Sequence, residues 1–346
     1  MPQTLHKILV IRNDKLGDFT LALPSFALLK ACLPRTELTA LVPAYTRDIA
    51  TLCPAIDQII IDPGKHSGHS AHKQLLQALR QQQYDAVLTL YSTTRIGYLV
   101  WRSGIRQRFA PATKLAQLFY NHRLRQRRSL SQKPEYQYNL DLAQFMLQQF
   151  AMPGVAVPPP PYLQLDQQRA NAIRHEFYQQ HGLSEQALFV FLHPGHGGSA
   201  NNLSPLQFAE LADLITCKRP LVFIISAGPG ETDCARQVQQ RIRQHKACLY
   251  ESTQGLGQFV YHIGFADLFI SGSTGPLHVA GALNRPTVGF YPNRRSATSL
   301  RWQTLSDDEL RLAFSPAPDA EAEDMSRVDI KAAAATISEF LNRLYS

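Results

Sequence analysis

The stretch Ile8-Leu-Val-Ile-Arg-Asn-Asp-Lys-Leu-Gly-Asp18 decides the fold class of this 346-residue chain. Its four consecutive apolar residues predict a β-strand buried on both faces, which is typical of parallel sheets covered by helices. The strand runs into a polar turn, and an apolar helical stretch follows from Phe19 to about Leu33. We expect this unit to begin a doubly wound α/β domain, in which the turn after the first strand faces the ligand crevice.

The same pattern continues along the chain, where short β-rich segments alternate with longer helical ones. The predicted strands form two sets: residues 7–12, 38–42, 58–61 and 84–90, then residues 188–193, 221–225, 247–250, 267–270 and 287–291. Between the sets, the proline-rich residues 152–162 favour an extended connector. The sequence therefore predicts two βαβ domains, residues 1–155 and 163–327. We expect the amphipathic helix of residues 328–346 to pack back on the first domain.

Composition excludes several classes of protein. Hydrophobic residues make up 45% of the chain and charged residues 18%, which argues against intrinsic disorder. No apolar run approaches the roughly 18–20 residues of a membrane-spanning helix. The five cysteines are an odd number at wide spacing, so we expect free thiols in a cytoplasmic protein without a secretory leader.

The formal charge of +8 comes from one part of the chain. Residues 86–134 contain no Asp or Glu but ten basic residues: Arg95, Arg102, Arg106, Arg108, Lys114, Arg123, Arg125, Arg127, Arg128 and Lys133. Interleaved Phe109, Phe119 and Tyr120 leave a nucleic-acid surface open. Anionic lipid headgroups or a phosphorylated, acidic sugar acceptor would suit the charge equally. A solvated loop that only keeps the protein soluble is the third reading.

Asp18 is the candidate for proton transfer in the first half. It stands where a helix N-cap is expected, and capping alone would explain an aspartate there. At the mouth of a crevice, the same carboxylate could act as a general base. The turn has a single glycine, Gly17, and lacks the G-x-G-x-x-G pattern of dinucleotide-binding proteins, which argues against an NAD-dependent dehydrogenase.

The second half carries three glycine-rich loops, each directly after a predicted strand. They read His193-Pro-Gly-His-Gly-Gly-Ser199, Ser226-Ala-Gly-Pro-Gly-Glu231 and Ser271-Gly-Ser-Thr-Gly-Pro-Leu-His278. One such loop could be a simple turn, but three in one domain predict backbone N–H groups and a helix start that bind a nucleotide diphosphate. His66, His69 and His72 lack acidic or thiol companions, so we predict no metal site there.

These motifs, together with Arg12-x-Asp14-x-x-Gly17-Asp18 and the segment that runs from Ser273 to Pro292, resemble glycosyltransferase family 9, the ADP-heptose:lipopolysaccharide heptosyltransferases. The resemblance implies a GT-B architecture, an α/β fold of two Rossmann-like domains facing a central cleft. It implies an acceptor on the N-terminal domain and a nucleotide sugar on the C-terminal one. It also implies an inverting, metal-independent reaction that needs no cofactor.

Carried over by position, the resemblance places the catalytic base on Asp18. It places donor contacts on Gly197, Gly198, Ser199, Asn202, Gly228, Glu231, Ser273, Thr274, Gly275 and His278, with Glu231 near the ribose hydroxyls. Some family members have aspartate at the position of Ser273 and a lysine near that of Asn202. Acceptor contacts are expected from Arg12, Asp14, Arg102, Arg123, Arg125, Arg127 and Arg128.

The expected activity is transfer of heptose from ADP-heptose to the inner core of lipopolysaccharide, at the inner face of the cytoplasmic membrane. The phosphates and acidic sugars of that core would suit the basic stretch better than a nucleic acid would. Two alternatives remain open at this point. One is a catalytically silent family member that binds nucleotide sugars in envelope assembly, and the other is a GT-B-like nucleotide-sugar epimerase.

Overall fold

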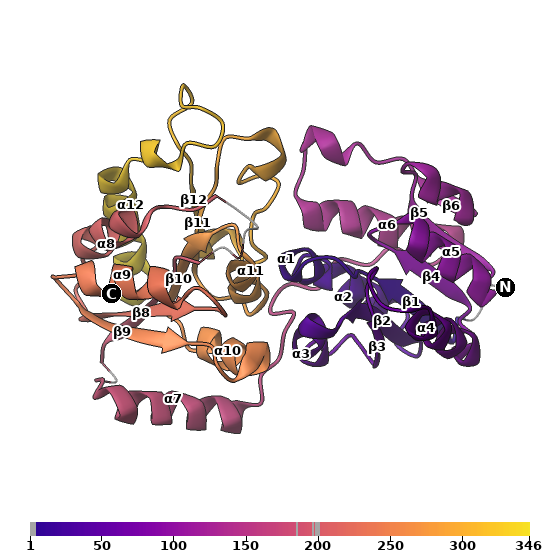
Figure 1. The fold of residues 1–346 in the computed structure, drawn as a ribbon, viewed down its shortest axis with the longest axis horizontal. Coiled ribbons are helices and arrows are strands. Elements are labelled where there is room, and N and C mark those ends of the chain that lie inside the picture. Colours follow the sequence, from indigo (N-terminus) through magenta and orange to yellow (C-terminus); the bar gives the residue numbers. More distant parts are fainter. Residues whose placement is uncertain (1–4, 185, 196, 198–200) are drawn as a thin grey trace. The chain divides into compact units, whose positions relative to one another are not determined.

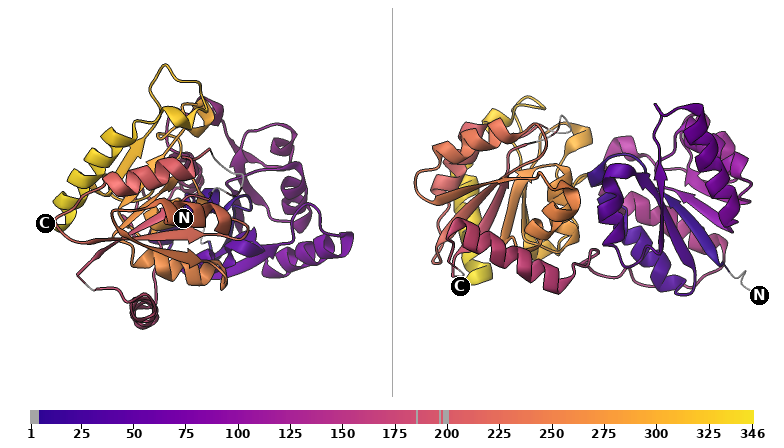
Figure 2. Two further views of the ribbon diagram at one scale, coloured as in Figure 1. Left: turned by 60° about the vertical axis from the view of Figure 1, so that its left-hand side comes forward. Right: turned by 60° about the horizontal axis from the view of Figure 1, so that its bottom comes forward.

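The computed structural model describes residues 5–184, 186–195, 197 and 201–346, and its chain divides into two compact units. Unit 1 comprises Met1–Ser129 and Lys133–Leu163, and unit 2 comprises Leu130–Gln132 and Gln164–Ser346. The division after Leu163 falls beside the proline-rich residues 152–162. Each unit is an α/β body with helices on both faces of its sheet (Figures 1 and 2).

The sheet of unit 1 has six parallel strands among the described residues, in the order β3-β2-β1-β4-β5-β6. The strands are β1 (Lys7–Ile11), β2 (Glu37–Pro43), β3 (Gln58–Asp62), β4 (Ala86–Thr89), β5 (Gln107–Pro111) and β6 (His122–Leu124). The apolar run of β1 pairs on both sides, with Ile8 opposite Leu38 of β2 and Ala86 of β4. This central position explains why β1 has no polar alternation.

Helices cover both faces of this sheet, as Figure 1 shows. They are α1 (Leu16–Thr20), α2 (Leu23–Cys32), α3 (Arg47–Thr51), α4 (His69–Gln82), α5 (Thr94–Ser103) and α6 (Glu135–Gln149). On one face, α4 and α5 contribute Leu75, Leu79 and Ile96 to a buried cluster with strand residues such as Leu9. The helices α2 and α6 pack against each other.

Unit 2 repeats the design within its described residues. Its parallel strands, ordered β12-β11-β10-β7-β8-β9, are β7 (Leu188–His193), β8 (Leu221–Ala227), β9 (Lys246–Glu251), β10 (Leu268–Gly272), β11 (Thr287–Phe290) and β12 (Arg311–Phe314). Its helices are α7 (Gln167–His181), α8 (Pro205–Leu214), α9 (Thr232–Arg241), α10 (Gly255–Gly264), α11 (Gly275–Ala282) and α12 (Ile330–Tyr345). The structure starts α8 at Pro205, and α11 starts at Gly275 in the third glycine-rich loop, where a helix start is expected.

The C-terminal helix α12 packs on unit 2, so the expectation that it returns to the first domain was wrong. Its apolar residues follow a helical period, and Ile330, Ile337 and Leu341 join the buried cluster that α8 and the strands of unit 2 form. Its polar side supports the same docking, because the Ser338 hydroxyl accepts a hydrogen bond from the Thr216 N–H at 2.9 Å. The helix thereby completes the core of unit 2.

Strand order locates the places where ligands bind in such folds. Both sheets have the order 3-2-1-4-5-6 of a doubly wound fold, when β7 is counted as the first strand of unit 2. The order reverses between β1 and β4, and between β7 and β10. Ligands bind outside the carboxyl ends of the strands at this reversal, so the loops after these four strands are where function is expected. None of the described helices is long and apolar enough to span a membrane.

Gly281 in α11 offers a test of this packing. An added Cβ atom would lie 2.7 Å from the Thr304 Cβ and 2.8 Å from the Leu305 backbone nitrogen. Alanine favours a helix over glycine by up to ~1 kcal/mol, but overpacking a core costs about 1–3 kcal/mol. We therefore expect Gly281→Ala to lower the free energy of unfolding by about 1 kcal/mol in urea titrations. Gly154→Ala, where a Cβ meets nothing within 4 Å, is the control, and equal midpoints for the two variants would contradict the prediction.

Candidate active site

Asp18 lies just past the carboxyl end of β1, inside the first turn of α1. The expected role as N-cap was wrong, because the helix begins at Leu16 and Lys15 occupies the cap position without a side-chain cap. The Asp18 carboxylate instead accepts a hydrogen bond from the Arg12 guanidinium at 2.5 Å. A charged partner close by outcompetes the backbone N–H groups that a capping side chain would bind.

Arg12 is the centre of this part of unit 1, and only 2% of its side chain is exposed. Its Nε donates to the Asp14 carboxylate at 2.8 Å, and its Nη1 donates to Glu135 Oε1 at 3.1 Å and to Asn139 Oδ1 at 3.0 Å. Asp14 lies in the turn after β1, whereas Glu135 and Asn139 lie on α6. The guanidinium therefore fixes the start of α6 to the end of β1.

Glu135 also accepts a hydrogen bond from Arg128 at 2.6 Å. We call Arg12, Asp14, Asp18, Arg128 and Glu135 the Arg12 cluster. It holds two cations and three carboxylates, so with all groups charged it carries one excess negative charge. The Glu135 side chain is almost fully buried, at 1% exposure. Its own negative charge is compensated by Arg12 and by Arg128.

Burial and the neighbouring charges together set the pKa values in the Arg12 cluster. Burial raises the pKa of Asp18 to about 6, Arg12 opposes this, and the Asp14 and Glu135 carboxylates add to it. Burial alone would lower the pKa of Arg12, but the three carboxylates outweigh it and raise that pKa above its usual range. Arg12 therefore stays cationic, while Asp18 exchanges its proton close to neutral pH.

Two tyrosines that the sequence analysis did not single out flank the Arg12 cluster. The Tyr45 hydroxyl donates to the Asp14 carbonyl at 2.7 Å, and the Arg12 guanidinium lies 5.9 Å from the centre of the Tyr91 ring. Tyr91 follows β4, so the Arg12 cluster and this ring lie on the two sides of the strand reversal. Both tyrosines are exposed, at 54% and 43%. They border the site with surfaces that could contact a sugar.

The basic residues between positions 86 and 134 fall into two groups. Some are bonded to carboxylates or backbone carbonyls, and others are exposed. Arg95 pairs with Asp62, where hydrogen bonds from Arg95 and Asn13 hold the pKa of the carboxyl below its usual range although burial would raise it. Arg108 donates to backbone carbonyls, and Lys133 pairs with Asp141. Of the residues expected to contact the acceptor, Arg12, Asp14 and Arg128 belong to the Arg12 cluster. The others are exposed, namely Arg102, Arg123, Arg125 and Arg127.

In unit 2, the Glu231 carboxylate joins the loops after β7 and β8. Its oxygens accept hydrogen bonds from the N–H groups of Gly197 at 2.8 Å and Gly228 at 3.0 Å. A Cβ atom at Gly195 would stand 2.1 Å from this carboxylate, so a larger residue there would displace the Glu231 side chain. His193 Nε2 lies 3.6 Å away, and burial lowers the pKa of that imidazole even though Glu231 favours its charged form. Glu231 holds the loops in place and keeps lone pairs for further hydrogen bonds.

Asn202 also holds the loop after β7 in place. Its amide nitrogen donates to the Pro194 carbonyl at 3.0 Å, its Oδ1 accepts from the Leu203 N–H at 3.0 Å, and it packs against Gly272 at the end of β10. The loop after β7 is thus anchored across the strand reversal of unit 2. Gly198 and Ser199, which are expected to contact the donor, lie outside the described residues.

The helix α11 begins where the Ser273–His278 motif predicts. Thr274 is its N-cap residue, and its hydroxyl bonds Ser271 Oγ at 3.0 Å rather than the helix. The first N–H groups of α11 therefore keep the unpaired state of any helix start, which favours an anion. Burial lowers the pKa of His278 to about 4, so the imidazole is neutral at pH 7. His278 can contribute a hydrogen bond here but no positive charge.

Arg301 and Trp302, which the sequence analysis did not single out, lie beside α11. The Trp302 ring is 6.3 Å from the His278 ring, and the Arg301 guanidinium is 5.5 Å from the Trp302 ring. Trp302 is fixed by its indole N–H, which donates to the Ser296 carbonyl at 2.8 Å. Arg301 thus places a permanent cation beside the Trp302 ring, which in turn lies beside His278 of α11. No local motif marks either residue, because both come from an irregular segment after β11.

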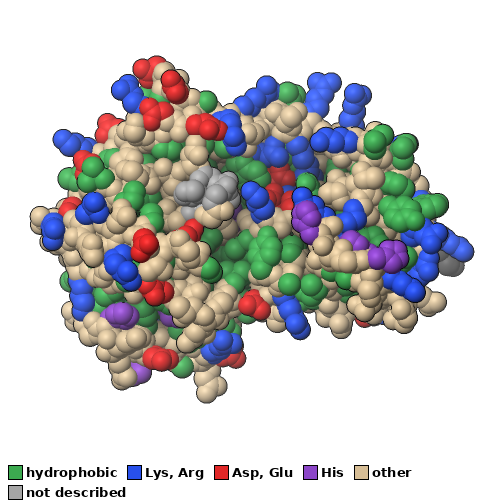
Figure 3. Space-filling view, in the orientation of Figure 1, with side chains coloured by type: hydrophobic (Ala, Val, Ile, Leu, Met, Phe, Trp, Pro, Cys, Tyr) green, Lys and Arg blue, Asp and Glu red, His purple; other side chains and the backbone are tan. Residues whose placement is uncertain are grey.

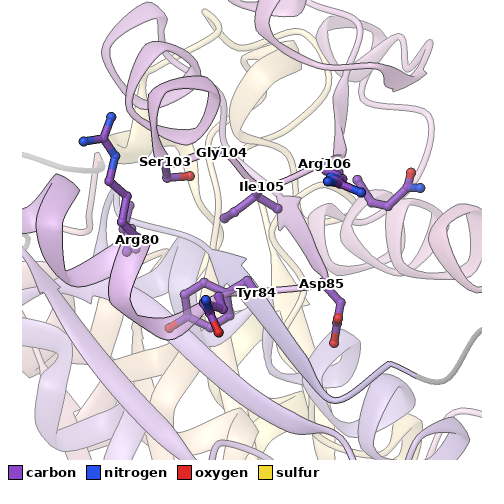
Figure 4. Close-up of a pocket in the computed structure, with 10 residues that line it drawn as sticks. Arg80, Tyr84, Asp85, Ser103, Gly104, Ile105 and Arg106 are labelled. Carbon is purple, nitrogen blue, oxygen red and sulfur yellow. The ribbon is translucent and has the colours of Figure 1, made fainter.

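A cavity of about 550 Å³ lies elsewhere in unit 1. Figure 4 shows it between Arg80 and Arg106, with Tyr84 and Asp85 along one side. These residues precede β4 and β5, so the cavity lies at the amino ends of the strands, opposite the Arg12 cluster. The Asp85 carboxylate is engaged by the backbone N–H groups of His6 and Lys7, at 2.6 and 2.9 Å. The cavity is therefore separate from the candidate active site.

Residues 72–326 match the sequence profile of glycosyltransferase family 9 (heptosyltransferase). The chain belongs to this family. It is 43% identical, over 99% of its length and 98% of the relative's, to a Haemophilus influenzae protein whose name assigns it provisionally to the glycosyltransferases. It is 25% identical to lipopolysaccharide heptosyltransferase 2 of Escherichia coli K12, over 82% of each chain.

Solved structures agree on the fold. The structure of the E. coli ADP-heptose lipopolysaccharide heptosyltransferase II superposes with a TM-score of 0.77 at 19% identity, covering 98% of this chain and all of that one. This structural similarity confirms that the chain has the predicted α/β fold of the GT-B type. The protein is thus a glycosyltransferase of family 9, and the resemblance drawn from the motifs is confirmed.

The charge excess of the Arg12 cluster predicts a pH-dependent gain in stability for Asp18→Asn. Because the folded state raises the pKa of Asp18 from 3.8 to about 6, its favourable contribution is present below pH 4 and lost as the pH rises through 6. We expect Asp18→Asn to match the wild type at pH 4 and to exceed it by on the order of 2 kcal/mol at pH 8. Urea unfolding at both pH values measures this. Asp233→Asn, at a side chain 95% exposed, should show no such difference, and a destabilised Asp18→Asn at pH 8 would contradict the prediction.

Proposed function

We propose that this glycosyltransferase moves heptose from ADP-heptose to the inner core of lipopolysaccharide, with inversion at the anomeric carbon and Asp18 as general base. The observation that supports the base is the Arg12 cluster, which fixes Asp18 at the strand reversal of unit 1 and brings its pKa to about 6. A base with a pKa near the working pH combines an ionised form with a useful proton affinity. The donor and acceptor are proposed from the named relatives.

In the proposed reaction the acceptor hydroxyl attacks the anomeric carbon from the face opposite the diphosphate. The hydroxyl oxygen forms a bond to that carbon, the bond from the carbon to the diphosphate oxygen breaks, and Asp18 takes the hydroxyl proton. Arg12 holds the carboxylate through one oxygen, Oδ1. The other oxygen, Oδ2, can therefore receive the proton while Oδ1 keeps its hydrogen bond to Arg12.

The leaving diphosphate would bind at the start of α11 and beside the loop after β7. Backbone N–H groups there are already oriented, so they stabilise the developing charge with little rearrangement. His278 contributes hydrogen bonding, and Arg301 supplies the positive charge that the family's lysine near Asn202 would supply elsewhere. These groups support a reaction without a resident metal ion or other cofactor, which an assay with and without EDTA tests directly.

The acceptor is proposed to approach unit 1, where Tyr45, Tyr91 and the exposed arginines offer contacts for sugars and phosphates. In this proposal the protein is cytoplasmic and contacts the inner face of the membrane peripherally.

The alternative of a silent, nucleotide-sugar-binding member predicts ADP-heptose binding without ADP release. Incubation with ADP-heptose and heptose-deficient core lipopolysaccharide separates the two, because ADP release that depends on the acceptor requires transfer. Isomerised free sugar would instead indicate an epimerase.

Asp18→Asn is expected to lower kcat by about 10²–10⁴-fold, which is the usual contribution of general-base catalysis. The variant should retain the wild-type Kd for ADP, since Asp18 belongs to unit 1 and the proposed donor site to unit 2. ADP release in single-turnover assays measures the rate, and calorimetry measures the affinity. Transfer at close to the wild-type rate by a folded, ADP-binding variant would remove Asp18 from the mechanism.

The pH dependence of kcat/KM follows from the raised pKa of Asp18. The carboxylate must be ionised to accept a proton, so the rate should rise about tenfold per pH unit at low pH and level off near pH 6. Glu135→Gln removes one of the charges that raise this pKa, and the bend should move to lower pH. A profile with the same bend in both proteins would show that another group controls it.

Arg301→Ala is expected to weaken ADP binding by about tenfold, the effect of one charge-assisted contact of ~1.5 kcal/mol. The matched control is Arg343→Ala, because Arg343 also lies over an aromatic ring, 5.3 Å from the centre of Phe340, but on α12. Both variants lose one cation and one ring contact. Titration with ADP should therefore separate a charge near the diphosphate from a general loss of charge, and equal Kd values for the two variants would exclude Arg301.

A further inference from the structure

Unit 1 exposes a cluster of large apolar side chains that the proposed reaction does not use. Leu115 is 72% exposed, Leu118 73%, Trp101 50% and Tyr98 48%. We call these four residues the α5–η2 face, because two lie on α5 and two on the 3₁₀ helix η2 (Leu115–Phe119). Soluble proteins rarely expose contiguous apolar patches, and a patch with polar surroundings indicates an interaction site.

The local structure forces these side chains outward. In η2, residues three apart lie on the same side, because a 3₁₀ helix has three residues per turn. One side of η2 carries Ala116 and Phe119, which face α5, where a Cβ at Gly97 would come within 2.8 Å of the Phe119 ring. Leu115 and Leu118 occupy a second side of η2 and remain exposed. The glycine in α5 thus lets η2 dock closely and present two leucines.

The aromatic residues extend the same face. The ring of Tyr98 lies 6.0 Å from that of Trp101, and both lie within 6.3 Å of the Phe119 ring. Trp and Tyr favour the interface between water and hydrocarbon, where their rings are buried and their polar atoms stay hydrated. Neighbouring leucines add the apolar area that inserts more deeply. The composition suits a lipid surface.

The charge around this face has a single sign. Arg102, Arg106 and Lys114 are exposed next to it in the chain, and residues 86–134 contain no Asp or Glu. Farther along, Arg123, Arg125 and Arg127 are exposed while the residues between them are partly buried, so they form a row. Figure 3 shows hydrophobic side chains next to Lys and Arg side chains on the part of unit 1 that carries α5. A second copy of the chain would meet equal charges here, which disfavours self-association.

We propose that the α5–η2 face inserts into the headgroup region of an anionic bilayer and that the neighbouring arginines and lysine bind its lipid phosphates. The inference rests on the proposed function in one respect, namely that an acceptor carried by a membrane makes docking useful. It goes beyond that function by assigning the docking to the α5–η2 face, which contains no residue of the candidate active site. The four apolar side chains supply burial, and the cations select membranes with negative charge.

Binding to vesicles tests the proposal with the full chain. We expect the protein to sediment with vesicles of phosphatidylcholine and phosphatidylglycerol, to sediment little with vesicles of phosphatidylcholine alone, and to bind more weakly at high salt.

The double variant Leu115→Ser, Leu118→Ser should bind the anionic vesicles about tenfold more weakly, or weaker still. Replacing Arg123, Arg125 and Arg127 by Gln should weaken it about 100-fold, at roughly fivefold per charge. The matched control, Leu206→Ser with Leu214→Ser on α8, changes leucines that are 66% and 40% exposed in unit 2 and should bind like the wild type.

Tryptophan fluorescence reports insertion separately from charge. The chain has two tryptophans, Trp101 and Trp302, and anionic vesicles should shift the emission to shorter wavelength in the wild type but not in Trp101→Phe. Binding that depends on the arginines without this shift, or that survives the Leu115 and Leu118 changes, would overturn insertion. A concentration-dependent dimer that the two leucine changes abolish would overturn it in favour of self-association.

The outcome is independent of the proposed activity. With a water-soluble core oligosaccharide as acceptor, the variant carrying Leu115→Ser and Leu118→Ser should release ADP at the wild-type rate, because neither residue belongs to the Arg12 cluster or to the proposed donor site. With acceptor in anionic vesicles, its rate should fall with its binding. If transfer fails for every protein while vesicle binding follows the prediction, the proposed function is wrong and the docking surface stands.

Discussion

The guanidinium of Arg12 is the constraint on which unit 1 depends. An arginine cannot lose its charge, so burying it at the end of β1 requires carboxylates around it. Two of these, Asp14 and Asp18, come from the adjacent turn, but Glu135 comes from 123 positions further along the chain. The helix α6 must therefore begin at the mouth of the sheet. Its Asn139 reinforces the arrangement by donating to the Leu21 carbonyl at 3.1 Å, beyond the end of α1.

The same cluster explains why a stable arrangement can also be reactive. Two cations would be neutralised by two carboxylates, and a third carboxylate leaves an excess that no described cation of the cluster balances. Burial raises the pKa of Asp18 to about 6, and the Asp14 and Glu135 carboxylates add to this rise. A carboxylate with such a raised pKa is a local instability that the surrounding ion pairs tolerate. Under the proposed mechanism, catalysis and stability thus make opposite demands on Asp18.

The sequence predicts the parts of the fold that local pattern determines. Continuous apolar runs identified the central strands, and the turn after β1 marked Asp18, the proposed base, because this residue lies shortly after the strand. The strands β5, β6 and β12 were missed, since Arg108, Arg123 and Arg311 interrupt their apolar pattern. Glu135 was missed for another reason, because only the fold brings it to Arg12, 123 positions away. The docking of α12 was also invisible, since an apolar helical face does not specify which core it covers.

In the proposed mechanism, the two units have the same topology but opposite electrostatic requirements. A base must keep its proton affinity, which a negative environment increases, whereas a leaving diphosphate needs donors and positive charge. In unit 1, the strand reversal carries an excess of carboxylate, and in unit 2 the equivalent reversal carries glycine N–H groups, a helix start and Arg301. If Arg301 and the α11 helix start flanked the base at one strand reversal, they would lower the pKa of Asp18 and weaken it as a base. In the proposed reaction, housing the two sets in separate folding units preserves both properties.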